Sequence, residues 1–418
     1  MPDVYFAHLL LVLAIVLISA KLGGHAAKRL GQPSVLGELV VGVALGNLPL
    51  LGYDVFEPWK TDPSMLVFSQ LGVILLVFQV GVQSTVREML GVGVPALLVG
   101  AFGVTGSFAL GTAAATLLLP EAGAHVHIFL GATLSATSIG ITARVLKDLG
   151  KARTPEARII LGAAVVDDVL GLVILAIITG AIAAGAGGAG VSAGAVLWIV
   201  FKASAFLFGA LALGVALSPR LFAVAAQLDA SGALIAAALG FCFLLAWVAG
   251  EMGLAPIIGA FAAGLVLEDA HSREFVERGE RSLDDVLEVL TSLLVPVFFV
   301  LTGARTDLAA FTHLKVVLLA LGLTAAAILG KQVCLLGTIG RPVNRLSVAI
   351  GMIPRGEVQL IFANLGATIV VAGAPLVDND AFSAIVMVVV LTTLVTPPAL
   401  ARTFRRDANR GAAGALRG

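Results

Sequence analysis

The stretch GAAVVDDVLGLV, from Gly162 to Val173, places two adjacent aspartates in an otherwise apolar run. An ionised side chain at the centre of a bilayer costs about 2.5–3.5 kcal/mol even on a lenient insertion scale. Such residues therefore pair or face a cavity, and they mark functional sites by default. Neighbouring side chains on a helix point about 100° apart. We therefore expect Asp167 and Asp168 to have different surroundings, one an aqueous cavity and the other a neighbouring helix.

The composition of the whole chain is that of a polytopic helical membrane protein. Of the 418 residues, 59% are hydrophobic and only 12% are charged, and the mean hydropathy is +1.04. Soluble domains contain roughly 25% charged residues, so a soluble enzyme and a disordered chain are excluded. The net charge of zero excludes a nucleic-acid binder. Continuous rather than alternating apolar runs disfavour a membrane β-barrel. The two cysteines, Cys242 and Cys334, lie in apolar runs and predict neither a disulfide nor a metal site.

A membrane-spanning helix needs about 20 mostly apolar residues, and this criterion predicts about thirteen segments. They are residues 4–20, 34–51, 65–83, 93–119, 125–149, 155–184, 191–217, 231–250, 254–268, 284–304, 314–339, 344–372 and 380–404. With the N-terminus outside, nearly all the loop Lys and Arg residues fall on the cytoplasmic side, as the positive-inside rule requires. Residues 1–404 are thus expected to form one multi-pass unit, and residues 405–418 a short cytoplasmic tail.

The segments divide into six, one and six, so that two units start from opposite sides of the membrane. Inverted repeats of this kind are typical of secondary transporters. The fifth and twelfth segments then correspond, and both contain helix breakers, ATLSATSIGIT at Ala132–Thr142 and GMIPRGE at Gly351–Glu357. A matched pair of interrupted helices predicts an ion site at mid-membrane depth. Freed carbonyls and the hydroxyls of Thr137 and Ser138 would supply oxygen ligands beside Asp168.

Three further ionisable residues lie inside apolar segments. Lys331, in AAAILGKQVCLLG, is expected to pair with Asp167 or Asp168, because a buried ammonium needs an anionic partner. Arg355 and Glu357 flank a glycine beside the second break. They are expected to pair with each other or to brace the half-helices, and a structural role at a gate is favoured over direct ion binding.

Other charged residues in these segments have weaker interpretations. Arg144 and Lys202 are expected to lie near the cytoplasmic membrane surface, with their charged ends reaching water. For Glu38, a packing role and a functional role are equally open.

A carboxylate that holds a proton or a cation, but not both at once, provides the simplest chemistry of an antiporter. An ion channel is the first alternative, but no pore-loop filter sequence is found. An intramembrane aspartyl protease is the second alternative. Its two acids should come from different helices that face each other, whereas Asp167 and Asp168 are neighbours.

Several stretches together resemble a known family. They are SATSIGITARVLKDLG (135–150), RIILGAAVVDDVLGLV (158–173), GLAPIIGAFAAGLVL (253–267) and GMIPRGEVQLIFANLG (351–366), with Lys331 in LGKQ. On these residues the whole chain resembles bacterial sodium/proton antiporters of the monovalent cation/proton antiporter superfamily. The resemblance is greatest to NapA-type members of the electrogenic, double-aspartate branch.

The resemblance implies an all-α NhaA/NapA-like fold with crossed discontinuous helices and elevator-like alternating access. It also implies a homodimer in the bacterial cell membrane. The dimerisation or scaffold part would comprise about 1–83 and 231–304, and the moving core about 93–184 and 314–404. A linker helix at about 191–217 would join them.

The resemblance also implies residue roles. Asp168 would be the principal carboxylate for cation and proton, and Asp167 would pair with Lys331 when no cation is bound. Thr137 and Ser138 would line the site. An aspartate at 167 together with Lys331 implies electrogenic exchange, with more than one proton moving per cation.

The expected substrates are Na⁺ and H⁺, with a K⁺/H⁺ antiporter or a K⁺ efflux protein as the alternative. No cofactor and no enzymatic activity are expected. No G-x-G-x-x-G unit follows the last segment, so a nucleotide-binding regulatory domain in the same chain is not expected either.

Overall fold

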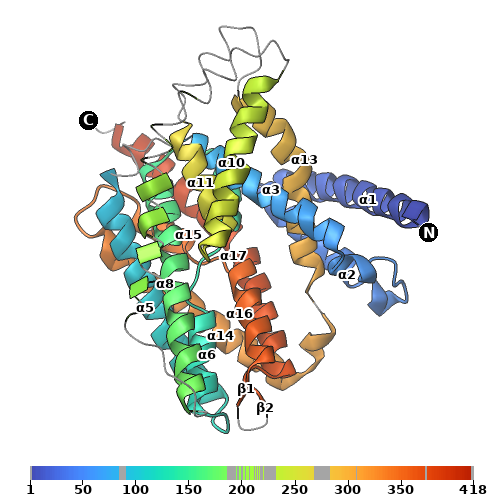
Figure 1. Ribbon diagram of the computed structural model, residues 1–418, viewed down its shortest axis with the longest axis vertical. Coiled ribbons are helices and arrows are strands. Elements are labelled where there is room, and N and C mark those ends of the chain that lie inside the picture. The colour runs from blue at the N-terminus through green and yellow to red at the C-terminus, as the bar shows by residue number, and fades with distance from the viewer. Residues whose placement is uncertain are drawn as a thin grey trace.

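The computed structural model describes residues 2–83, 91–185, 232–267, 283–306, 308–371 and 374–415, with isolated positions between 194 and 220. Within these residues the chain is almost entirely helical (Figure 1). The expected linker helix at 191–217 falls mostly outside the described residues.

The helices pack in two groups. The first contains α1 (Pro2–Arg29), α2 (Ser34–Gly46), α3 (Pro63–Val82), α10 (Ala233–Glu251), α11 (Pro256–Val266) and α13 (Leu283–Ala304). The second contains α5 (Gly93–Leu118), α6 (Ala124–Thr133), α7 (Ile139–Asp148), α8 (Pro155–Gly185), α14 (Leu314–Gln332), α15 (Arg345–Gly351), α16 (Glu357–Thr368) and α17 (Asn379–Ala415). In the first group α13 packs on α3 and α2, and in the second α5 packs on α14 and α8. The contacts that join the groups include those of α7 with α2 and α3.

Short elements connect the helices. The described residues include the 3₁₀ helices η1 (Leu48–Leu51), η2 (Glu57–Lys60), η3 (Ala309–Thr312) and η4 (Val333–Thr338). Two antiparallel two-residue strands, β1 (Val370–Val371) and β2 (Ala374–Pro375), form a small hairpin between α16 and α17.

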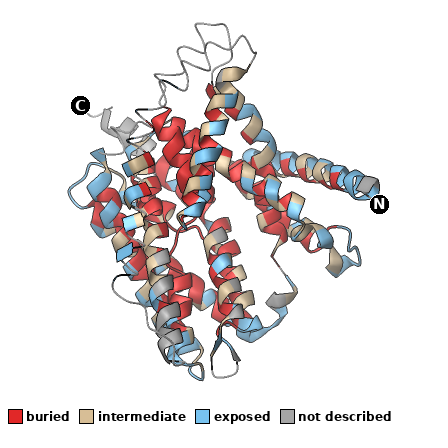
Figure 2. Ribbon diagram, in the orientation of Figure 1, coloured by how far each residue is buried: buried red, intermediate tan, exposed pale blue. Residues whose placement is uncertain are grey.

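The structure confirms a polytopic membrane fold. Six described helices, at least 20 residues long, are apolar enough to cross a membrane. They are Val4–Arg29, Pro63–Val82, Gly93–Leu118, Leu283–Ala304, Leu314–Thr338 and Asn379–Arg405. Every expected segment other than 191–217 coincides with a helix or a pair of half-helices. Buried residues concentrate where the helices meet (Figure 2). Large apolar side chains such as Leu10 and Trp247 are exposed, as lipid contact allows.

Glycine permits the closest helix packing in the second group. A Cβ atom at Gly106 of α5 would collide with the carbonyl oxygen of Gly330 on α14, and one at Gly330 would collide with the backbone of α5. Small residues let membrane helices approach in this way without a hydrophobic driving force between them. The approach brings the end of α14, which carries Lys331, against α5.

The residues expected as a tail from 405 are helical and continue α17 as far as Ala415. One expectation differs from the structure. The charged end of Arg144 does not reach open solvent: only 9% of the residue is exposed, and its side chain forms an ion pair with Glu38 of α2. The expectation of a snorkelling arginine was wrong because a carboxylate from a distant segment lies within reach of the guanidinium.

Candidate ion site at a crossing of two broken helices

The first break lies between α6 and α7. Helix α6 ends at Thr133 and α7 begins at Ile139, with non-helical backbone between them. The Ser135 hydroxyl donates to the Ala132 carbonyl at 2.7 Å, which satisfies one acceptor at the end of α6. Ser138 caps α7 and accepts a hydrogen bond from the Ile141 amide. Serine is a preferred residue at this capping position, so the Ser/Thr-rich stretch forms a stable break.

The second break lies between α15 and α16. Helix α15 ends at Gly351 and α16 begins at Glu357. Pro354 lies between them, where it lacks an amide hydrogen and cannot continue a helix. The Gly356 amide donates to the Gln359 side-chain oxygen at 2.7 Å, which satisfies a donor at the start of α16.

The two breaks cross each other and are joined by hydrogen bonds. The Ser138 amide donates to the Pro354 carbonyl at 2.9 Å. The Thr137 hydroxyl donates to the Met352 carbonyl at 3.0 Å, and the Gln359 side-chain nitrogen donates to the Ala136 carbonyl at 2.6 Å. Backbone groups that each break frees are therefore satisfied partly by the other break. The expected crossed, discontinuous helices are confirmed.

Asp167 of α8 is fully buried beside this crossing. Its Oδ2 atom accepts a hydrogen bond from the Thr137 hydroxyl at 2.6 Å and forms an ion pair with Nζ of Lys331, which is also fully buried. Its Oδ1 atom has no hydrogen-bond partner among the described residues. Of the two aspartates, Asp167 is thus the one that pairs with Lys331.

Asp168 faces a different environment. It lines a cavity of about 280 Å³ and is 5% exposed. The cavity lies between the two helix groups: its other walls are Gln70 of α3, Gly253–Ile257 at the turn from α10 to α11, and Val358, Ile361 and Phe362 of α16. Of the two adjacent aspartates, Asp167 therefore forms an ion pair and Asp168 lines a cavity.

Arg355 is completely buried within the second break. Its Nη1 atom donates to the carbonyls of Met352 and Ile353 at 3.2 and 3.1 Å, and its Nη2 atom donates to the Ser107 hydroxyl at 3.3 Å. A cation at a helix C-terminus is stabilised by the macrodipole, so Arg355 braces the end of α15 against α5. Glu357 begins α16, and its side chain lies outside the described residues.

Sequence reasoning missed Gln359, although a signal was present. Glutamine three residues after an N-cap is the spacing of a capping box, and Gln359 stands three residues after Gly356. We expect Gln359→Leu to lower the free energy of unfolding by about 2 kcal/mol or more, because it leaves the Gly356 amide and the Ala136 carbonyl buried without partners. Thermal unfolding in detergent measures this effect.

Gln332→Leu is the matched control, because the side chain of Gln332 bonds within its own helix, to the Ile328 carbonyl at 3.1 Å. Equal stability losses in the two variants would contradict the bracing role of Gln359.

The fold and the site define a class of protein: a polytopic membrane protein whose broken helices cross beside buried charges, as in secondary transporters. Residues 11–406 match the family described as sodium/hydrogen exchanger, transmembrane. The chain belongs to this family, which is a family of transporters and not of enzymes. The described part of the chain contains no group of three or more His, Cys, Asp and Glu residues that could hold a metal ion.

Individual relatives agree with the family assignment. The chain is 34% identical to the high-affinity Na⁺/H⁺ antiporter NhaS3 of Synechocystis, covering 95% of this chain and 90% of the relative. It is 35% identical to the Na⁺/H⁺-K⁺ antiporter GerN of Bacillus cereus, covering 94% and 95%. The solved structure of the sodium proton antiporter MjNhaP1 from Methanocaldococcus jannaschii superposes with a TM-score of 0.64 at 17% identity, covering 94% of this chain and 97% of that one.

Proposed function

We propose that the protein exchanges Na⁺ for H⁺ across a bacterial cell membrane by alternating access. Membership of the sodium/hydrogen exchanger family supports this proposal, as do the names of the relatives from Synechocystis and Bacillus cereus. K⁺ remains the second candidate cation, because the Bacillus cereus relative is named as a Na⁺/H⁺-K⁺ antiporter.

The cavity position of Asp168 is the observation that carries the proposal. This carboxylate lines the space between the helix groups, next to a crossing of broken helices. A hard monovalent cation prefers oxygen ligands, and a carboxylate that holds the cation cannot hold a proton. Asp168 therefore exchanges one for the other. Thr137 and Ser138 do not line this cavity: Thr137 binds Asp167 and Ser138 caps α7, so they support the site from the crossing.

Asp167 and Lys331 form the second part of the proposed mechanism. Both are fully buried and form an ion pair with each other. Cation binding at Asp168 draws Asp167 away from Lys331, and the lysine releases its proton because a buried ammonium without an anion is costly. A second proton then moves per cation, which makes exchange electrogenic.

The proposed moving parts follow the two helix groups. The second group acts as the core that carries the ion site, and the first group acts as the scaffold of a homodimer. Sparse contacts between the groups, compared with those inside each group, support this division. The N-terminus lies outside and the C-terminus in the cytoplasm, as the distribution of Lys and Arg requires.

Proteoliposomes that contain a pH-sensitive dye test the function, with Na⁺, Li⁺ and K⁺ compared and with the membrane potential clamped or free. We expect Na⁺ to trigger saturable proton movement that is faster when the potential is clamped, because net charge accumulates otherwise. Current without coupled proton movement would indicate a channel and contradict the proposal. An equal response with the potential clamped or free would contradict electrogenic exchange.

A further inference from the structure

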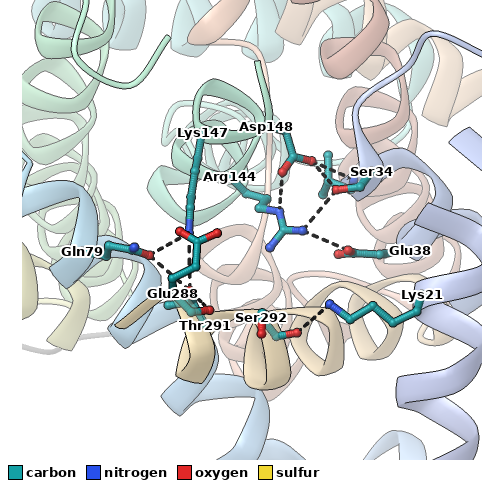
Figure 3. A network of polar contacts seen from close by, with 11 residues as sticks. Lys21, Ser34, Glu38, Gln79, Arg144, Lys147, Asp148, Glu288, Thr291 and Ser292 are labelled. Atoms are coloured by element: carbon teal, nitrogen blue, oxygen red, sulfur yellow. Dashed lines mark hydrogen bonds and ion pairs between the residues drawn. The ribbon is translucent and has the colours of Figure 1, made fainter. Parts of the chain in front are cut away.

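A polar network connects the two helix groups at the end of α7 (Figure 3). Resting on the proposed alternating access, we infer that this network is a latch that holds the molecule in the access state seen here. Arg144 and Lys147 of α7 are its central cations. Their partners come from α2, α3 and α13 in the other group.

The first half of the latch surrounds Arg144. Its Nη2 atom lies 3.0 Å from Oε1 of Glu38 and 3.1 Å from the Ser34 hydroxyl, both on α2. Asp148, one turn along α7, lies 3.0 Å from Nε of Arg144 and accepts from the Ser34 hydroxyl at 2.6 Å and from the Val35 amide at 3.2 Å. One short stretch of α7 thus makes charged contacts to the start of α2.

The second half of the latch surrounds Lys147. Its Nζ atom donates to the side-chain oxygen of Gln79 on α3 at 2.7 Å and to the Thr291 hydroxyl of α13 at 3.4 Å. The Thr291 hydroxyl also donates to Gln79 at 3.1 Å. Glu288 of α13 lies 3.7 Å from Nζ of Lys147, and its side chain is 67% exposed. The main contacts of Lys147 in this half are therefore those with the buried Gln79 and Thr291.

The latch and the ion cavity lie on opposite sides of the crossing. Helices α7 and α16 both begin at the crossing. The latch lies at the far end of α7, whereas Val358, Ile361 and Phe362 of α16 line the Asp168 cavity. A larger cavity of about 640 Å³ also separates the groups on the α16 side, between Arg305 of the first group and Leu360 of the second. The groups are therefore joined by charges at one end and separated at the other.

Ionic chemistry suits a contact that must open and close. The Coulombic gain of a buried ion pair is nearly balanced by the desolvation of its charges. When the groups separate, Arg144 and Glu38 regain water, so opening costs less than the exposure of an equal apolar surface. Removing Glu38 has a different effect. It takes away the anion that the first group offers to the buried Arg144 in the latched state, whereas Asp148, on the same helix as Arg144, stays beside it in either state. The access equilibrium then shifts away from that state.

Thiol labelling measures this equilibrium without any need for transport. The reporter is Ile361→Cys, which stands on the second group and lines the Asp168 cavity. The two natural cysteines, Cys242 and Cys334, are fully buried, and the chain without the reporter gives the background rate. A charged, membrane-impermeant maleimide is added to vesicles of each orientation. We expect Glu38→Gln to slow labelling of the reporter about tenfold from the side to which the cavity opens.

Glu156→Gln is the matched control. Its Oε1 atom accepts from the Asn344 amide at 2.9 Å, so both partners belong to the second group, and labelling should stay within about twofold of the parent rate. A folded Glu38→Gln protein that labels at the parent rate would overturn the latch. So would equal slowing by Glu156→Gln.

Ser34→Ala keeps the test decisive if Glu38→Gln does not fold. It removes only the hydroxyl that bridges Arg144 and Asp148, and we expect labelling to slow about threefold. An unchanged rate would overturn the latch. Labelling does not depend on ion exchange, so a parent protein that labels but does not exchange Na⁺ for H⁺ would refute the proposed function and leave the latch as a separate result.

Discussion

Replacing Asp168 with asparagine is expected to reduce cation-driven proton exchange to the level of empty vesicles. The amide keeps the shape of the carboxylate but can neither release a proton nor offer a negative charge to a cation. Because Asp168 lines the cavity between the helix groups, no other described residue of the cavity wall can replace its charge. Dye-loaded proteoliposomes measure the loss, with Na⁺ added over a wide range of concentrations.

Asp54→Asn is the control for this variant. It makes the same chemical change at an exposed position in the loop between η1 and η2, and its exchange rate should equal that of the parent protein. Exchange in folded Asp168→Asn at more than half the parent rate would contradict the assignment of the site.

Replacing Lys331 with glutamine is expected to lower the free energy of unfolding by about 3–5 kcal/mol. The buried Asp167 carboxylate would lose the one cation that contacts it by hydrogen bond within the described part of the chain. The double variant Asp167→Asn/Lys331→Gln should recover a large part of this loss, since no charge is then left buried alone. In vesicles, Lys331→Gln should also move less charge per cation. Thermal unfolding in detergent and current recordings on supported membranes measure the two effects.

Lys60→Gln is the control for Lys331→Gln. Lys60 pairs with Glu57, whose side chain is 53% exposed, and such surface pairs contribute at most about 1 kcal/mol. If the double variant is as unstable as the sum of its single changes, the two side chains do not act as a pair. If charge per cation is unchanged in Lys331→Gln, the lysine is not part of the proton coupling.

Much of the fold follows from local patterns in the sequence. Apolar runs of membrane-spanning length place the helices, and proline, glycine and clustered hydroxyl residues locate both breaks. The matching positions of the breaks at Ser135–Ser138 and Met352–Gly356 follow from the repeat, because each unit must cross the membrane in the same pattern from the opposite side. These features depend only on nearby residues and on the thickness of the bilayer.

Contacts between distant segments could not be predicted in the same way. The sequence shows that Arg144 lies in a polar stretch, but not that Glu38, more than a hundred positions earlier, lies beside it. The same limit applied to Lys331: from the sequence alone, either Asp167 or Asp168 could be its ion-pair partner. Helix periodicity separates Asp167 and Asp168 in direction, and the packing of α8 and α14 against α5 decides which carboxylate meets the lysine.

Proton release on Na⁺ binding tests the central claim most directly. Purified protein in weakly buffered detergent solution is mixed with Na⁺ while a pH-sensitive dye reports free protons. We predict saturable release of protons by the parent protein and none by Asp168→Asn. Calorimetric binding of Na⁺ to the parent protein without any proton release would contradict the claim that cation and proton occupy this carboxylate in turn.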